Sequence, residues 1–226
     1  MYSKNEDFEK DILKSEDNLK IKRVCQESYL AQSKITLVSG GICGGISTVH
    51  IITQLSAKQG EVINPFDNQD LMQKSANVQY EGSKTPHSGT GFKLILEKEL
   101  SLRKKRIRPE FCFHESERKN FINQFENKLK DKIEETSKDK KGRGIFIGTV
   151  INKLPTSDQK IYGAHAISMT TQIDQNNNLY CTGLDSNFFF ASAKDKDGCN
   201  KLAEMMAKTI NAYDTKHVET FTAELK

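Results

Sequence analysis

The stretch AHAISMTTQIDQNNNLYCTGLD, residues 164–185, decides the fold. Two strand-like runs, 164–170 and 179–184, flank the Asn-rich segment 174–178, whose composition is typical of a turn. This pattern predicts an antiparallel hairpin. Similar runs at 144–151 and 188–191 extend the pattern, so we expect an antiparallel sheet in the last third of the chain.

The chain before this sheet is predicted to be mainly helical, because its apolar residues recur at helical spacing. Helices are predicted over residues 7–32, 46–55, 67–77, 92–102, 121–133 and 201–213. The β-branched residues of 46–55 also allow a strand there, and Pro109 is expected to end the helix that precedes it. Helices first and strands second indicate an α+β fold. We expect one domain over 1–226, with 1–30 as a helical N-terminal extension.

Composition narrows the class of protein. The 226 residues are 36% hydrophobic and 28% charged, which suits one domain with a real core and argues against wholesale disorder. No run approaches the roughly 20 apolar residues that cross a bilayer, so an integral membrane protein is not expected. The polar start, residues 1–9, predicts no secretory signal peptide.

Five cysteines without a paired spacing predict reduced thiols rather than a disulfide framework. Cys112 and His114 form only a two-ligand fragment, whereas structural zinc takes four ligands. We therefore expect no metal and no cofactor. The remaining chemical question is whether one of the thiols is reactive.

Cys43 is the best-placed thiol. It lies in the glycine-rich segment SGGICGG, residues 39–45, directly before a predicted helix. Backbone amides and the helix dipole favour a thiolate at such a position, and the same amides can bind a developing oxyanion. The flanking glycines are expected to leave room for a substrate backbone.

A nucleophilic thiol also needs a base and a group that orients the base. His165 lies in the first strand of the predicted hairpin, and Asp185 ends the second. The hairpin would bring these two strand ends side by side. His165 and Asp185 are therefore the expected base and orienting carboxylate for Cys43.

Three motifs resemble the YopT-like family of papain-fold effector cysteine proteases. GICGGIS at 41–47 is similar to the family's cysteine motif, GAHAI at 163–167 to its histidine motif, and LDSNF at 184–188 to its aspartate motif. The resemblance implies a papain-like fold, with a helical N-terminal half carrying Cys43 and an antiparallel C-terminal sheet carrying His165 and Asp185. It also implies a protein substrate in a host cell, reached by an effector made in the bacterial cytoplasm and secreted without a signal peptide.

The side-chain donor of the oxyanion hole is not evident from the sequence. Papain-fold enzymes commonly place Gln or Asn five or six residues before the cysteine, but Leu37 and Val38 occupy those positions here. Gln32 and Ser39 are the candidates nearby.

Several alternatives stay open. The same three residues would serve a papain-fold deamidase, transglutaminase or acyltransferase, and a catalytically inactive papain-like module would bind a partner instead. The glycines at 40–45 lack the Lys-Ser/Thr ending of a phosphate-binding loop. The basic cluster Arg103–Arg108 is interpreted as a solvated or substrate-steering face, because the net charge is only +4, so no nucleic acid partner is expected. Association of this cluster with an anionic membrane surface remains an alternative.

Overall fold

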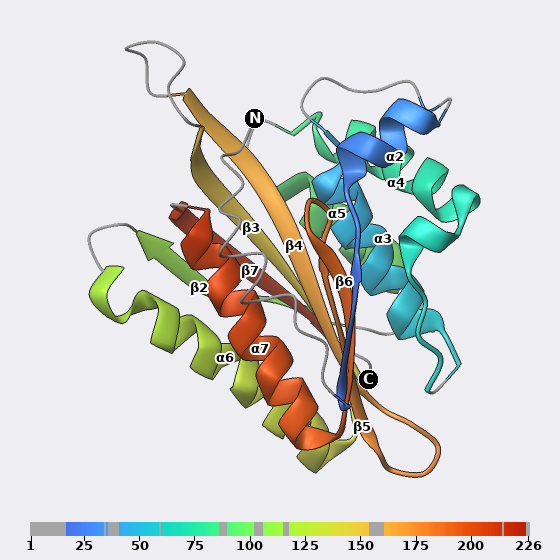
Figure 1. Cartoon of the computed structure of the whole chain (residues 1–226), viewed down its shortest axis with the longest axis vertical. Coiled ribbons are helices and arrows are strands. Elements are labelled where there is room, and N and C mark those ends of the chain that lie inside the picture. Colours follow the sequence, from blue (N-terminus) through green and yellow to red (C-terminus); the bar gives the residue numbers. More distant parts are fainter. Residues whose placement is uncertain are drawn as a thin grey trace.

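The computed structural model describes residues 17–33, 35, 41–58, 60–85, 90–101, 106–114, 118–153, 161–213 and 215–224. The elements in chain order are β1 (Leu19–Arg23), α2 (Gln26–Gln32), α3 (Cys43–Ser56), the 3-10 turn η1 (Pro65–Asp67), α4 (Gln69–Gly82), α5 (Thr90–Ser101), β2 (Arg106–His114), α6 (Arg118–Asp139), β3 (Arg143–Lys153), β4 (Ile161–Ile173), β5 (Leu179–Asp185), β6 (Phe189–Lys194), α7 (Asp195–Ala212) and β7 (Thr215–Glu224) (Figure 1). None of the helices in these ranges is long and apolar enough to cross a membrane.

The strands form one sheet of seven, in the order β1-β6-β5-β4-β3-β7-β2, and all neighbouring strands are antiparallel. The predicted hairpin is confirmed as β4 and β5, with Ile173 paired to Leu179. Its turn is held by Asp174, whose carboxylate accepts hydrogen bonds from the amides of Asn176 and Asn178. Asn177 adopts the left-handed conformation with φ 63°, which Asn tolerates better than most residues. The α+β class predicted from the sequence is therefore correct.

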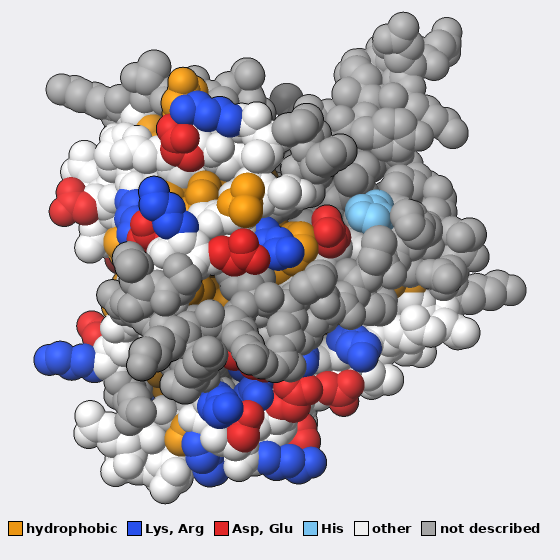
Figure 2. Space-filling view, turned by 180° about the vertical axis from the view of Figure 1, so that it is seen from behind, with side chains coloured by type: hydrophobic (Ala, Val, Ile, Leu, Met, Phe, Trp, Pro, Cys, Tyr) orange, Lys and Arg blue, Asp and Glu red, His pale blue; other side chains and the backbone are white. Residues whose placement is uncertain are grey.

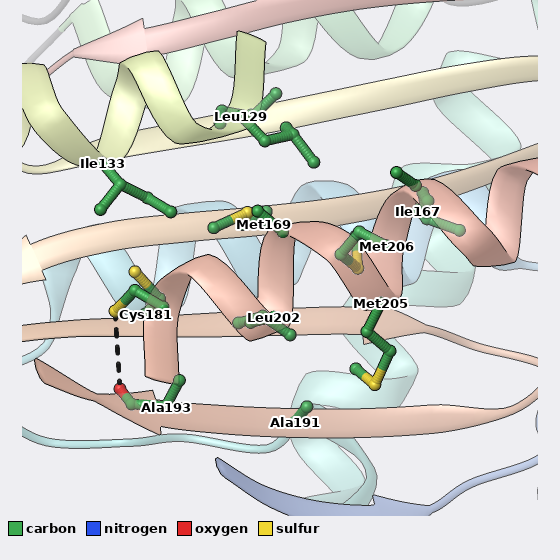
Figure 3. Close-up of a cluster of buried hydrophobic side chains, with 14 of the residues drawn as sticks. Leu129, Ile133, Ile167, Met169, Cys181, Ala191, Ala193, Leu202, Met205 and Met206 are labelled. Carbon is green, nitrogen blue, oxygen red and sulfur yellow. Dashed lines mark hydrogen bonds between the residues drawn. The ribbon is translucent and has the colours of Figure 1, made fainter. Parts of the chain in front are cut away.

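Helices cover both faces of the sheet: α3, α4 and α5 lie on one side and α6 with α7 on the other (Figure 1). The largest hydrophobic cluster among the described residues lies between the sheet and the layer formed by α6 and α7, which pack on the central strands (Figure 3). The labelled contacts come from Leu129 and Ile133 of α6, Leu202, Met205 and Met206 of α7, Ile167 and Met169 of β4, Cys181 of β5, and Ala191 and Ala193 of β6. Burial of these side chains fixes the central strands that carry the candidate site.

The N-terminal segment differs from the prediction. Residues 19–23, expected to be part of a helical extension, form the edge strand β1, which pairs with β6 from Leu19↔Ala193 to Arg23↔Phe189. Helical spacing of a few apolar residues is a weak signal here, because main-chain hydrogen bonds to the exposed edge of β6 decide the conformation. A helix forms only at α2, and residues 7–16 lie outside the described residues.

The predicted division into a helical N-terminal half and a C-terminal sheet is only approximate. β1 and β2 come from the first half of the chain, and the long helices α6 and α7 come from the second. Pro109, predicted to end a helix, lies inside β2 beside a register shift between Pro109 and Phe111. β2 is an edge strand, where proline is tolerated because one side of the strand lacks a hydrogen-bonding neighbour.

Candidate active site

Cys43 is the first residue of α3, which begins three residues earlier than the predicted helix 46–55. The chain enters the helix through Gly41, whose φ of 90° suits glycine, and through Ile42, which is fully buried. Cys43 is 8% exposed as a residue and packs among apolar residues of α3, α5 and the sheet. The positive end of the helix dipole therefore faces the sulfur atom, which favours the thiolate.

The glycines after Cys43 serve helix packing. A Cβ atom at Gly44 would lie 2.3 Å from the ring of Phe92, and one at Gly45 would lie 1.9 Å from the carbonyl oxygen of Ser75. The expectation that these two glycines leave room for a substrate backbone is thus wrong, because the protein itself fills the space. They allow α3 to approach α4 and α5 closely and so fix where Cys43 lies.

His165 and Asp185 meet as the hairpin predicts. Ile167 pairs with Asp185 across β4 and β5, which places His165 diagonally across from the carboxylate. His165 Nε2 lies 3.1 Å from Asp185 Oδ1. Both residues are buried, with exposed fractions of 3% for His165 and 0% for Asp185. The Cys43 thiol lies within reach of the His165 imidazole, which acts on the thiol pKa through a hydrogen bond and through its charge. Because Nε2 faces Asp185, Nδ1 is the imidazole nitrogen left for the thiol.

The pKa values of the thiol and the imidazole shift in opposite directions. Burial by itself raises the pKa of Cys43, but the hydrogen bond and positive charge of His165, with the amides of Ala166 and Gly44, lower it below its usual 9.0. Burial also lowers the pKa of His165, but the charge and hydrogen bond of Asp185, then those of Cys43, raise it from 6.5 to about 10. The arrangement favours a thiolate–imidazolium pair at neutral pH.

Comparison with known proteins gives one informative likeness. No family model matches the chain, and no curated protein sequence matches it significantly. Among solved structures, the chain is similar to the Pseudomonas avirulence protein AvrPphB.

The two folds superimpose with a TM-score of 0.50 over 80% of this chain and 90% of AvrPphB, at 14% sequence identity. AvrPphB is a papain-fold effector cysteine protease of the YopT family. The resemblance to that family, predicted from three short motifs, is therefore confirmed at the level of the fold.

Asp185 has two further partners that the sequence did not indicate. The hydroxyl of Tyr213 donates to the carboxylate, at 2.8 Å from Oδ2 and 3.0 Å from Oδ1, and the amide of Asn187 donates to Oδ1 at 2.9 Å. The Tyr213 ring also packs on the His165 ring, with centroids 4.8 Å apart. Tyr213 directly follows α7, and its place on the apolar stripe of that helix indicated only a core residue. These donors hold the carboxylate oriented toward the imidazole.

Gln26 is the third residue that sequence reasoning missed. It is 6% exposed at the start of α2, and its amide contacts both the residue before Cys43 and the turn after Asp185. Of the earlier candidates, Gln32 is exposed at the end of α2, whereas Leu37, Val38 and Ser39 lie outside the described residues. Gln26 is 17 positions before Cys43, so no short-range spacing could have identified it.

A second buried histidine, His50, belongs to the same helix as Cys43 and contacts the two strands that carry His165 and Asp185. His50 of α3 is fully buried and hydrogen-bonds with Ser168 Oγ of β4 and Thr182 Oγ1 of β5, both at 2.8 Å. Thr182 in turn shares a hydrogen bond of 2.6 Å with Thr170. Burial lowers the pKa of His50 from 6.5 to about 3, so this imidazole stays neutral.

Of the other cysteines, three have side chains that the structure describes. Cys25 is exposed, Cys181 and Cys199 are buried, and the side chain of Cys112 lies outside the described residues. Within the described ranges, no three His, Cys, Asp or Glu side chains gather as a metal site. The side chains of Arg103–Arg108 also lie outside those ranges. On the face shown in Figure 2, the described Lys and Arg side chains lie interspersed with Asp and Glu.

Proposed function

We propose that this protein is a papain-like cysteine protease in which Cys43, His165 and Asp185 form the catalytic triad. The observation that carries the proposal is the buried chain of contacts from the thiol through the imidazole to the carboxylate, with the thiol at a helix N-terminus. Thiol, base and orienting carboxylate in hydrogen-bond reach are the arrangement that nucleophilic catalysis requires. The papain-like fold of AvrPphB supports the same assignment.

In the proposed mechanism, the Cys43 thiolate attacks the carbonyl carbon of a peptide bond and forms a C–S bond. The His165 imidazolium then gives its proton to the leaving amine as the C–N bond breaks, which leaves a thioester. His165 next takes a proton from water, whose oxygen displaces the thiolate and releases the acid. Asp185 keeps Nε2 protonated and stabilises the imidazolium, so that Nδ1 exchanges the proton in both steps.

The backbone around Cys43 supplies part of the transition-state stabilisation in this proposal. The amide of Gly45 donates to Gln79 Oε1 at 2.9 Å, and the amide of Gly44 contacts the Cys43 sulfur. The amide of Cys43 itself donates to no group in the described part of the chain. It is therefore the backbone donor that we assign to the developing oxyanion.

The proposed substrate is a protein of a host cell, and the proposed location is the host cell after delivery from bacteria. Both come from the resemblance to YopT-like effectors and from the avirulence protein that shares the fold. Deamidation or acyl transfer would use the same thioester, so the products must distinguish these reactions.

The thiol itself gives the first test. We expect iodoacetamide to label Cys43 rapidly at about pH 6, where an ordinary thiol is almost fully protonated. Mass spectrometry of the digested protein identifies the labelled residue, and the exposed Cys25 is the internal control. Labelling of Cys43 that rises only near its usual pKa of 9.0 would contradict the proposal.

The products give the second test. Peptide libraries incubated with the protein should yield pairs of fragments whose masses sum to the parent plus water, and the Cys43→Ala variant should yield none. Intact peptides in which an amide has become an acid, or in which a nucleophile has been added, would assign the site to deamidation or acyl transfer instead.

A further inference from the structure

The N-terminal segment reaches the site through the main chain of Gln26. The amide of Gln26 donates to the carbonyl of Ser186 at 2.7 Å, and the amide of Val24 donates to that of Phe188 at 3.1 Å. These bonds continue the pairing of β1 with β6 past the end of the strand. The first residue of α2 is therefore fixed against the turn that directly follows Asp185.

The side chain of Gln26 then connects this turn to Cys43. Oε1 accepts a hydrogen bond from the amide of Ile42 at 2.9 Å, and Nε2 donates to Asn187 Oδ1 at 2.6 Å. Ile42 directly precedes Cys43, and the amide of Asn187 donates to Asp185 Oδ1. One buried glutamine thus joins the residue before the nucleophile to the residues that hold the carboxylate. We name the contacts of Gln26 with Ile42 and Asn187 the Gln26 bridge.

The start of α3 depends on this bridge because its own cap is weak. The N-cap residue, Ile42, has no side-chain oxygen to bond the first amides of the helix. The preceding Gly41 is held in a left-handed conformation, and a Cβ atom there would lie 3.3 Å from Gln26 Oε1. Gln26 is therefore the side chain that sets the direction in which the chain enters α3 at Cys43.

We infer that Gln26 is a positioning residue that holds Cys43 and Asp185 at the separation at which His165 bridges them. The inference rests on the proposed protease function and extends it to the N-terminal segment. His165 contacts both partners only while the start of α3 at Cys43 and the turn after Asp185 keep their spacing. Without the bridge, we expect the thiolate–imidazolium pair to weaken and the pKa of Cys43 to rise.

The test uses the full chain with Gln26→Met, which keeps the length of the side chain and removes both side-chain hydrogen bonds. The rate of Cys43 alkylation by iodoacetamide is measured against pH. We expect the rate at about pH 6 to fall about tenfold, as a rise of one unit in the thiol pKa requires. Alkylation proceeds by direct displacement and forms no oxyanion, so it reports on the thiolate alone.

Gln54→Met is the matched control. Gln54 is also a buried glutamine, but its side chain bonds the carbonyl of Glu61 and the amide of Ile63, far along α3 from Cys43. This variant should lose thermal stability and keep the wild-type pH profile of alkylation. Asn187→Ala breaks the same bridge from its half-buried end and should shift the profile as Gln26→Met does. It also keeps the inference testable if Gln26→Met does not fold.

Two outcomes would overturn the inference. Wild-type alkylation with slower peptide hydrolysis in Gln26→Met would show that Gln26 acts on the acyl intermediate and does not position the thiol. An equal shift in Gln54→Met would show a general loosening of the fold. The wild-type profile tests the proposed function by itself, since an ordinary Cys43 titration there contradicts the protease proposal whatever the variants do.

Discussion

Two buried histidines contact side chains of the β4–β5 hairpin, and their pKa values shift in opposite directions. His165 contacts a thiol and a carboxylate, and its pKa rises to about 10. His50 contacts two hydroxyl groups, and its pKa falls to about 3. Burial lowers the pKa of both, so the neighbours decide the outcome. The comparison separates the proposed reactive site from a structural polar contact.

We expect the largest effect when His165 loses its carboxylate partner, because the difference between the two histidines then shrinks most. In Asp185→Ala, His165 keeps its burial but loses the carboxylate that raises its pKa most, so its pKa should fall well below about 10. We expect kcat/KM to fall about a thousandfold or more. Measurement combines peptide hydrolysis with an NMR titration of the imidazole.

Asp131 is an exposed residue of α6, so Asp131→Ala is the control for Asp185→Ala. Its activity should equal that of the wild type. Asp185→Asn keeps an acceptor for Nε2 and should fall between the two. An unchanged His165 pKa in Asp185→Ala would show that the carboxylate is not the source of its raised value.

Removal of the structural histidine should affect stability and leave the site intact. His50→Leu leaves Ser168 without its described partner, so the free energy of unfolding in urea should fall by about 2 kcal/mol. The pH profile of Cys43 alkylation should not change. Adding Ser168→Ala should recover part of the loss, because the hydroxyl left unpaired is then removed while Thr182 keeps its hydrogen bond with Thr170. A changed alkylation profile would instead give His50 a part in the chemistry.

The buried His50 should also make the stability of the protein depend on pH. Below pH 6.5 the unfolded chain protonates His50, whereas the folded chain resists protonation down to about pH 3. The unfolded state then binds more protons, so stability falls as the pH falls through this window. In His50→Leu this contribution is absent, and its urea midpoint should fall less steeply with acid than that of the wild type. Equal slopes would mean that His50 is protonated in the folded protein.

The smallest effect is expected from the ring that covers the site. Tyr213→Phe keeps the packing on His165 and removes the hydrogen bonds to Asp185, so we expect kcat/KM to fall about tenfold, as the loss of a hydrogen bond to a charged group implies. Tyr80→Phe, at a tyrosine that is 54% exposed, should be indistinguishable from the wild type. Unchanged activity in both variants would make Tyr213 a packing residue only.

Much of the site follows from local patterns. Alternating strand residues around an Asn-rich turn predict the hairpin, and its register brings His165 to Asp185. Glycines before an apolar run predict a helix next to Cys43, and α3 indeed begins there. These features depend on neighbours a few residues away, where turn chemistry and periodicity are informative.

By itself, the sequence determined the α+β class, the hairpin and a helix just after Cys43, and it led to the three residues of the proposed triad. Only the tertiary structure decided that residues 19–23 form an edge strand and that Gln26 and Tyr213 reach the site. The physical reason is separation along the chain: Gln26 bonds Asn187 across 161 positions, and Tyr213 bonds Asp185 across 28. Contacts of that range are set by sheet order and helix packing, which no local spacing encodes.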